Sequence, residues 1–568
     1  MSIKDEGQKQ KAEAKIKSLH RDAEEQKAKN LAEELGFPYL DLRISTIDDE
    51  ALTISNEKDS KNAGAAIIEE KQKELFVVVL DPRLKETLIF VQNLENKGYK
   101  ATINVVSLSS LNRVWSRFQH VKPDRKEISR KAEISAEELK QIEGGINTIE
   151  DLKQKLEQPN LSTSDLLNIV MAAGLKLEAS DIHLENESTN TTRLRYRLDG
   201  ILQDAANISL SAYQLLLSRI KMLSELKLNV HDVPQDSRFS FKSSAESEES
   251  KEIEIRTSII PANYGENIVL RILDPKTIGL EVGDLGIQEY DFKIITEELK
   301  KPNGMIITTG PTGSGKTTLL YAFLKAVNDP GSKIITLEDP IEYHLKGVEQ
   351  TQVDSEKGYT FASGLRSILR QDPDTILVGE IRDNETATTA INAALTGHLV
   401  FSTLHTNDAA GAIPRLVDMK VNPTMIPPAL NLVIAQRLLR KVCPKCSQEI
   451  KPTKEILQKI QDELKNLPAR ASETVNMAGR PKLDDIKIKQ ASGQGCAYCN
   501  FTGYKGRVGV FELFVVNDAM EKVVLKTPSI VEIKESAIKS GMVLMKQDGL
   551  LKVLQGITTM EEVERILG

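Results

Sequence analysis

Residues 303–318 read NGMIITTGPTGSGKTT, and this stretch decides the fold class of the chain. Met305 to Thr309 is a short apolar, β-branched run that predicts a buried strand. The phosphate-loop pattern G-x-x-x-x-G-K-[ST] follows over 310–317, and an apolar helical pattern continues over 318–327. In this order, backbone N–H groups and a helix N-terminus can hold a polyphosphate. The stretch therefore predicts an α/β nucleotide-binding domain.

The residues of this loop have distinct expected tasks. Gly313 and Gly315 allow the tight turn, Lys316 reaches the β- and γ-phosphates, and Thr317 holds Mg²⁺. The loop thus predicts ATP and Mg²⁺ as cofactors. The expected nucleotide-binding residues are Gly310, Pro311, Thr312, Gly313, Ser314, Gly315, Lys316, Thr317 and Thr318.

Length and composition limit the possible classes of protein. A chain of 568 residues suggests about four domains. No apolar run reaches the roughly 18 residues that span a bilayer, and the first residues lack the apolar core of a secretory signal, so we expect a cytoplasmic protein. A net charge of −7 and a pI near 5.8 argue against nucleic acid as the main partner.

Changes in composition and periodicity predict the domain organisation. We expect a charged helix or tail (1–30), a small α/β recognition domain (31–118), a polar linker (119–160), an α+β domain (161–280), the nucleotide-binding core (281–440), a tetracysteine segment (441–510) and a C-terminal helical part (511–568). The expected fold class is multidomain α/β.

The α+β domain carries several arginines in segments that are expected to be strands. Beside a nucleotide site they favour phosphate sensing, because a guanidinium is always charged and donates in a planar fork. The alternative is that they pair with surface carboxylates, which contributes little. These residues are Arg193, Arg195, Arg197, Arg238, Arg256 and Arg271.

Polar side chains follow successive predicted strands of the core. Glu338 follows the strand over 333–337, Glu380 follows 376–378, and His405 follows 398–403. Open α/β sheets bind ligands at the carboxyl ends of their parallel strands. A carboxylate there suits the coordination of Mg²⁺ and the orientation of water.

Taken together, these motifs resemble the secretion ATPase superfamily. GPTGSGKTT (310–318), ITLEDPIEY (335–343), LRQDPDTILVGEIRD (369–383) and TGHLVFSTLHTND (396–408) are similar to its Walker A motif, acidic box, Walker B motif and histidine box. The resemblance extends over roughly 30–568 and is strongest to the assembly-type branch, the type IV pilus extension and type II secretion ATPases. The retraction branch lacks the first domain and the cysteine pairs found here.

The resemblance implies a hexameric motor with a RecA-like C-terminal core and a PAS-like second domain, with ATP between these two domains of a subunit and its neighbour. By this resemblance Lys316 and Thr317 bind phosphate and Mg²⁺. Glu338 and Glu380 are both candidates to activate the attacking water, and the sequence does not choose between them. The resemblance further implies γ-phosphate sensing by His398 and His405, and nucleotide-facing roles for Arg256, Arg271 and Arg238. No Arg-Leu-Gly-x-x-Leu pattern precedes Leu31, so we do not expect regulation by a cyclic dinucleotide.

All the cysteines of the chain lie in two C-x-x-C pairs, Cys443 with Cys446 and Cys496 with Cys499. Four thiolates suit a closed tetrahedral Zn²⁺ site of the structural kind. Residues 447–495 are too many for a compact zinc ribbon, so a helical insert over 454–467 is expected. A redox pair or unused thiols are the alternatives.

The sequence thus predicts an ATP hydrolase that moves an inner-membrane platform protein and so drives pilin or pseudopilin assembly. It would be a homo-hexamer, bound peripherally to the cytoplasmic membrane through that partner, with no direct nucleic-acid contact. Pilus extension and type II secretion remain alternatives. Two alternatives come from other classes of protein. The acidic net charge argues against a nucleic-acid translocase. The intact Lys316, Glu338 and Glu380 argue against a nucleotide-gated scaffold with little turnover.

Overall fold

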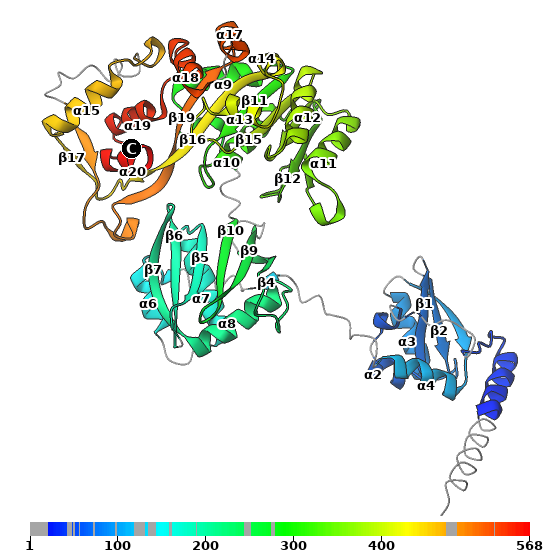
Figure 1. Ribbon diagram of the computed structural model, residues 1–568. Coiled ribbons are helices and arrows are strands. Elements are labelled where there is room, and N and C mark those ends of the chain that lie inside the picture. The colour runs from blue at the N-terminus through cyan, green and yellow to red at the C-terminus, as the bar shows by residue number, and fades with distance from the viewer. Residues whose placement is uncertain are drawn as a thin grey trace, which may run out of the picture. The chain divides into compact units, whose positions relative to one another are not determined.

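The chain forms two units, Met1–Ser129 and Arg130–Gly568, which are described separately. Their elements are labelled in Figure 1. The computed structural model describes residues 21–42, 48, 51–55, 57–71, 74–96, 99–118, 131–133, 144–157, 162–188, 190–243, 251–273, 279–472, 486–526 and 529–568. Among these residues, no helix has both the length and the apolar character that crossing a bilayer requires.

The first unit is built on a three-stranded sheet in the order β1-β2-β3. Strand β1 (Ala65–Lys71) runs antiparallel to β2 (Glu74–Val79), and β3 (Lys100–Val105) runs parallel to β2. Helix α3 (Lys85–Asn96) makes the crossover that a parallel pair requires. The other helices are α2 (Glu57–Asn62), α4 (Leu108–Arg117) and one over 21–35.

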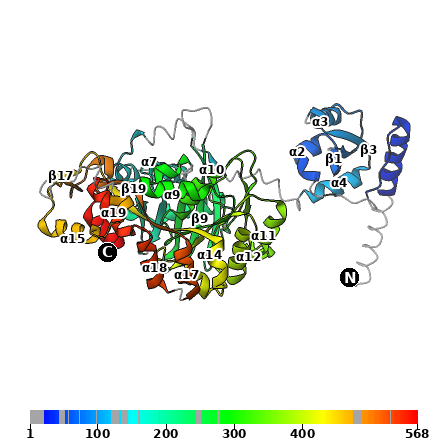
Figure 2. The same cartoon turned by 90° about the horizontal axis from the view of Figure 1, so that it is seen from above.

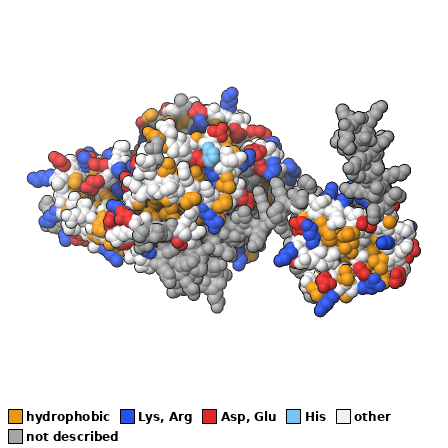
Figure 3. Space-filling model, turned by 90° about the horizontal axis from the view of Figure 1, so that it is seen from below, with side chains coloured by type: hydrophobic (Ala, Val, Ile, Leu, Met, Phe, Trp, Pro, Cys, Tyr) orange, Lys and Arg blue, Asp and Glu red, His pale blue; other side chains and the backbone are white. Residues whose placement is uncertain are grey.

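The surface of the first unit carries exposed apolar side chains (Figure 3). Leu84 and Leu88 lie one helical turn apart at the start of α3, and both are exposed, as is Ile89. The same helix buries Phe90 and Leu94 in the core of the unit. Helix α3 is therefore apolar on more of its circumference than core packing requires.

The second unit begins with a seven-stranded sheet in the order β4-β8-β9-β10-β5-β6-β7. One face packs against helices α7 and α8 through side chains such as Tyr196 and Phe239. A hairpin at Asp199-Gly200 joins β6 to β7, and both residues have positive φ. The elements are α6 (Ile149–Leu156), α7 (Thr163–Lys176), α8 (Leu210–Leu223), β4 (Lys131–Glu133), β5 (Asp181–Asn186), β6 (Thr191–Leu198), β7 (Ile201–Ser209), β8 (Gln235–Ser243), β9 (Lys251–Ala262) and β10 (Gly265–Leu273).

The structure corrects the C-terminal end of the expected linker, 119–160. Ile146 and Leu152, the latter in α6, are fully buried in the core of the seven-stranded sheet and its helices. Thr148 caps α6 by accepting from the Asp151 N–H, and Asp151 accepts from Thr148 N–H in return. The segment is therefore part of the folded domain despite its polar composition, because Ile146 and Leu152 anchor it in the core and the cap of α6 favours the helix.

The nucleotide-binding core is a second seven-stranded sheet, in the order β13-β12-β14-β15-β11-β16-β19. All neighbours are parallel except β16 and β19, which pair antiparallel. Helices cover both faces of this sheet (Figure 1 and Figure 2), so every residue of its central strands β11, β12, β14 and β15 is buried, whereas the edge strand β13 is polar. The strands are β11 (Gly304–Thr309), β12 (Ile334–Glu338), β13 (Glu349–Gln352), β14 (Thr375–Val378), β15 (Leu399–Leu404), β16 (Leu430–Val442) and β19 (Tyr504–Val515).

Strand β19 crosses the boundary expected at 510/511. It completes the core sheet, because Leu432 pairs with Val515 and the ladder continues to Val442 and Tyr504. The structure therefore assigns β19 to the core, and the helices after it pack on that core. Helices of this part of the chain are α9 (Glu289–Leu299), α10 (Lys316–Val327), α11 (Phe361–Ile368), α12 (Asn384–Leu395), α13 (Ala412–Asp418), α14 (Ile426–Ala429), α15 (Lys454–Leu464), α17 (Asp518–Lys526), α18 (Ile530–Lys539), α19 (Met545–Leu554) and α20 (Met560–Leu567).

Candidate nucleotide site

The polar residues predicted at strand ends gather along one edge of the core sheet. Strands β12, β14, β15 and β11 are parallel neighbours in that order, so their carboxyl ends lie side by side. Glu338 ends β12, Glu380 follows β14, His405 follows β15 and Gly310 follows β11. The structure thus brings both carboxylates and one histidine to the edge that carries the phosphate loop.

The phosphate loop needs glycine at two positions for steric reasons. Gly310 has φ 146°, and a Cβ there would lie 2.5 Å from the Gln436 carbonyl oxygen. Gly315, the N-cap of α10, has φ 93°, and its Cβ would lie 2.8 Å from Gln436 Nε2. The backbone of β16 therefore leaves no room for a Cβ at Gly310, the positive φ of Gly315 favours glycine there, and together they preset the loop conformation.

Lys316 is held over the loop that it serves. Its Nζ donates to the carbonyl oxygens of Gly310 at 2.8 Å and Pro311 at 3.2 Å. Burial lowers the pKa of Lys316, and the nearby Glu380 carboxylate opposes that shift. Thr317 stands in the first turn of α10 with its side chain exposed, where a metal-bound phosphate can reach it.

Glu338 is buried and fixed by three donors. Its Oε2 accepts from Tyr321 Oη at 2.5 Å, and its Oε1 accepts from Thr336 Oγ1 at 2.6 Å and Gln350 Nε2 at 3.1 Å. Tyr321 lies on α10, the helix that begins in the phosphate loop. The carboxylate is therefore tied to the element that binds phosphate, and its orientation is fixed before any nucleotide arrives.

Glu380 has different neighbours. Its Oε1 lies 2.5 Å from Arg382 and its Oε2 lies 3.3 Å from His405 Nε2. The carboxylate is mostly buried, whereas the imidazole is half exposed. Glu380 thus lies close to both the phosphate-loop lysine and His405, a position from which a carboxylate can bind a metal-bound water.

The structure corrects the grouping of the two histidines. His398 precedes β15, and its carbonyl oxygen accepts from the N–H of Gly304 at the start of β11. Six strand residues at about 3.3 Å each separate that point from the phosphate loop, a span of roughly 20 Å. His398 Nδ1 lies 2.9 Å from the Ala393 carbonyl oxygen. Only His405 therefore lies at the phosphate edge of this subunit.

Three arginines of the seven-stranded sheet β4–β10 form a row across neighbouring strands, which no periodicity in the sequence reveals. Arg256 on β9 pairs in register with Arg238 on β8 and with Arg271 on β10. Directly paired residues point to the same face of a sheet, so the three guanidinium groups share the face opposite α7 and α8. The next residue in the row is Asp181 on β5.

The three arginines have different partners. Arg256 Nη2 donates to the Ile341 carbonyl oxygen at 2.7 Å, and Nη1 lies 2.9 Å from Glu342, both in the acidic box. Arg271 pairs with Asp181 at 2.9 Å, and Arg238 lies 3.5 Å from Glu254. The structure thus brings Arg256 to the segment after Glu338, while Arg271 and Arg238 pair within their own sheet.

The four cysteines converge in space. All four Sγ atoms lie within 4.8 Å of one another, and three pairs of them lie 3.8 Å apart. A Zn–S distance of about 2.3 Å in a tetrahedron places sulfur atoms about 3.8 Å apart, so the spacing fits that metal. Burial opposes ionisation of the Cys499 thiol, but N–H groups of Cys496 and Gly503 outweigh it and lower its pKa to about 7.

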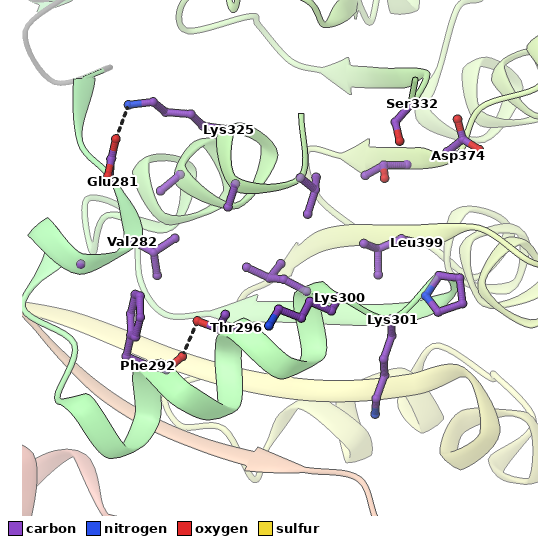
Figure 4. Close-up of a pocket in the computed structure, with 17 residues that line it drawn as sticks. Glu281, Val282, Phe292, Thr296, Lys300, Lys301, Lys325, Ser332, Asp374 and Leu399 are labelled. Carbon is purple, nitrogen blue, oxygen red and sulfur yellow. Dashed lines mark hydrogen bonds and ion pairs between the residues drawn. The ribbon is translucent and has the colours of Figure 1, made fainter. Parts of the chain in front are cut away.

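A cavity of about 750 Å³ lies between α9 and α10, away from these groups (Figure 4). Phe292 and Ala322 are among its apolar lining residues, and Lys325 at its rim pairs with Glu281. Asp374 and Leu399, at the amino ends of β14 and β15, also line it. The cavity therefore opens at the opposite edge of the sheet from the phosphate loop.

The sequence interpretation missed the residues that orient Glu338. Tyr321 belongs to the apolar pattern of α10, and Gln350 lies on β13, which was not predicted. A hydroxyl among apolar helix residues is the one available signal, because a buried tyrosine needs a partner for its O–H. Nothing in the sequence indicates that this partner is Glu338.

Together, the preset phosphate loop, the lysine above it and the two acidic strand ends define a P-loop ATPase with a RecA-like core. The chain belongs to the type II/IV secretion system protein family, whose characteristic region matches residues 157–565.

Named relatives agree with this assignment. The chain is 42% identical over 407 residues to type II secretion system protein E of Pseudomonas aeruginosa, covering 71% of this chain and 74% of that protein. It is 36% identical over 543 residues to the type IV pilus assembly ATPase PilB of Thermus thermophilus, covering 94% of this chain and 57% of that protein. It is 32% identical over 539 residues to PilB of Myxococcus xanthus, covering 94% and 89%.

Solved structures show the same fold. The ATPase DotB of Legionella pneumophila superposes with a TM-score of 0.50 at 21% identity, covering 72% of this chain and 97% of that one. DotB of Yersinia pseudotuberculosis gives a TM-score of 0.51 at 17% identity, covering 72% and 94%. The predicted family, fold class and ATPase activity are confirmed.

Proposed function

We propose that the chain is the hexameric motor of a type IV pilus assembly or type II secretion machine, working at the inner face of the cytoplasmic membrane. It would couple ATP hydrolysis to the displacement of an inner-membrane platform protein. The observation that carries this proposal is the convergence of Lys316, Glu338 and Glu380 at one sheet edge in a chain whose relatives are named for those machines. The exposed Leu84 and Leu88 support partner recognition by the first unit.

In this proposal the chain's own residues divide the chemistry of hydrolysis. Lys316 would move from its loop carbonyls to the β- and γ-phosphates, and Thr317 would hold Mg²⁺, which when bound would offset the negative charge of the transferring phosphoryl group. Glu380 would orient the water molecules on that ion. Glu338, already fixed by Tyr321, would position the attacking water.

We further propose that the cysteine cluster holds one structural Zn²⁺. The Sγ spacing supports it, since four thiols at tetrahedral distances without a disulfide have no other evident use. The metal would fix the two C-x-x-C segments, 443–446 and 496–499, which we call the knuckles, beside the β16–β19 ladder. It would take no part in hydrolysis, because four cysteines leave no open position.

Glu380→Gln should bind ATP within about threefold of wild type and hydrolyse it at least about 100-fold more slowly, because the amide cannot support the metal-bound water. Nucleotide titration and phosphate release measure the two effects. Glu385→Gln is the matched control, since Glu385 is exposed on α12 and pairs with Arg366. In a host whose own copy is deleted, the Glu380→Gln chain should restore neither surface pili nor type II secretion, and restoration of either by this variant would contradict the proposed motor.

Arg256→Ala and Arg271→Ala should each bind ADP normally and hydrolyse ATP at least about tenfold more slowly, since a charge-assisted phosphate contact contributes about 1.5–3 kcal/mol. For Arg271 this requires its Asp181 pair to open when ATP binds. Arg193→Ala is the control, because Arg193 on β6 pairs with Glu187, which directly follows β5, and lies outside the row of three arginines. A double variant that assembles and turns over at a near-normal rate would rule out nucleotide sensing by these two residues.

A further inference from the structure

Glu512 is a buried acid that none of the motifs above contains. It lies on β19 and is 4% exposed. Its Oε1 accepts from the N–H of Ala409 at 2.8 Å, and its Oε2 accepts from the N–H of Met545 at 3.1 Å. Each carboxylate oxygen thus holds a different segment, and the two segments are 136 positions apart in the chain, from 409 to 545.

The first of these segments is the loop of residues 405–411, which we call the histidine loop. It starts at His405, which lies 3.3 Å from Glu380. The next residue, Thr406, is bound to the end of β11: its N–H donates to Thr309 Oγ1 at 2.9 Å, and the two hydroxyl groups lie 2.6 Å apart. Thr309 immediately precedes Gly310, so the histidine loop is anchored to the base of the phosphate loop.

The second segment is the start of α19. Its N-cap, Leu544, has no side-chain acceptor to offer, so the first N–H groups of the helix need acceptors from elsewhere. Gln547 accepts from the Leu544 N–H at 3.0 Å, and Glu512 accepts from the Met545 N–H. A carboxylate at this end also suits the helix dipole.

Helix α19 in turn contacts α15, which lies between the two cysteine pairs in the sequence. Lys546 pairs with Glu463 of α15 at 2.5 Å, and Gln547 donates to the Glu463 carbonyl oxygen. A continuous set of hydrogen bonds therefore runs from the phosphate loop through the histidine loop and Glu512 to α19 and α15.

Burial raises the pKa of Glu512, while the two N–H bonds oppose that shift and Asp408 adds to it. Burying a carboxylate at this position therefore costs free energy, which an apolar side chain would not cost. The histidine loop and α19 could pack against β19 through apolar side chains alone, so the carboxylate is needed for the two amides that it binds.

We propose that Glu512 is a positioning residue for ATP hydrolysis, which holds the histidine loop so that His405 stays against Glu380 and links the movement of that loop to α19. The proposal rests on the proposed function and on a part in hydrolysis for His405, which lies beside Glu380 at the phosphate edge. Glu512 itself does not touch the reacting atoms.

The test is a double-mutant cycle on the full-length hexamer. Glu512→Gln keeps one acceptor oxygen but turns an amide donor towards a backbone N–H, so we expect kcat for ATP hydrolysis to fall at least about tenfold with KM changed by less than about twofold. In a His405→Ala background, the same substitution should cost less than about threefold, because the residue it positions is gone.

The matched control is Gln547→Ala. It removes another first-turn acceptor of α19 without touching the histidine loop, and kcat should stay within about twofold of wild type. If Glu512 only stabilised the fold, the control would slow hydrolysis equally, or Glu512→Gln would cost the same in both backgrounds. Either result overturns the proposal. A His405→Ala variant with normal activity would instead overturn the proposed site.

Amide hydrogen exchange tests the same link on the wild-type protein, so the result does not depend on whether a variant folds. Saturation with a non-hydrolysable ATP analogue should change the protection of peptides over 405–411 and 543–547 together. A change in the first peptide alone would show that Glu512 does not couple the two segments.

Discussion

The Lys316→Ala variant is expected to lose nucleotide binding and, with it, all measurable hydrolysis. In the structure, Lys316 Nζ donates to the Gly310 and Pro311 carbonyl oxygens, so the ammonium is held at the phosphate loop, from where it would move to the β- and γ-phosphates. Two charge-assisted contacts of about 1.5–3 kcal/mol each would be lost, which corresponds to at least about 100-fold weaker ATP binding.

Loss of the charge has a second effect in this site. Glu380 favours the charged form of Lys316, and without that ammonium the carboxylate would repel the phosphates more strongly, although Arg382 still pairs with it. The effect on ATP, with its extra charge, should therefore exceed the effect on ADP. Titration with fluorescent ATP and ADP measures both constants.

Lys325→Ala provides the matched control for this experiment. Lys325 lies at the other end of α10 and pairs with Glu281 at the rim of the cavity. Binding of ATP should stay within about twofold of wild type, because the residue is remote from the phosphates. If Lys316→Ala bound ATP within threefold of wild type, the loop would not be the nucleotide site.

The purified protein should contain about one Zn²⁺ per chain, and Cys496→Ser should release it and loosen the two knuckles. Structural Zn²⁺ can contribute on the order of 10 kcal/mol to local folding. We expect ordered structure to be lost over 443–453 and 486–503, the segments that the cysteines join.

Two features should limit that loss. The ladder between β16 and β19 is formed by backbone hydrogen bonds that do not depend on the metal. Helix α15 is held by Lys546 on Glu463 and by Lys459 on Glu564. Hydrogen exchange should therefore rise in the knuckles but not in α15 or in the phosphate loop.

Elemental analysis and exchange mass spectrometry together decide this prediction. Lys445→Ser is a control between two ligands, since Lys445 lies over the Tyr498 ring and offers no thiol. Protein that contains no zinc when purified without chelator would refute the metal assignment. Unfolding of α15 in Cys496→Ser would show that the metal stabilises more of the insertion than its contacts indicate.

The elements that carry the nucleotide site could be predicted from sequence because each has a strong local signal. Strand β11, the glycine loop and α10 are an apolar run, a steric pattern and a helical period in direct succession. The carboxyl ends of β12 and β14 were found in the same way, since buried parallel strands are continuous apolar runs that stop at a charge.

Features that depend on distant pairing could not be predicted. The row of Arg238, Arg256 and Arg271 exists only because of the strand register. His398 and His405 lie seven positions apart in one motif, yet a strand carries them to opposite edges of the sheet. The packing of this polar segment could not be predicted, since the burial of Ile146 and Leu152 depends on a sheet formed by later residues.

The β16–β19 ladder has an evolutionary consequence. Its last register pair is Val442 with Tyr504, so the chain leaves the sheet and returns to it at neighbouring positions on adjacent strands. The residues between them, 443–503, form an excursion whose two ends already meet. A lineage could exchange this excursion for a tight hairpin, or enlarge it, and every remaining strand would keep its partners.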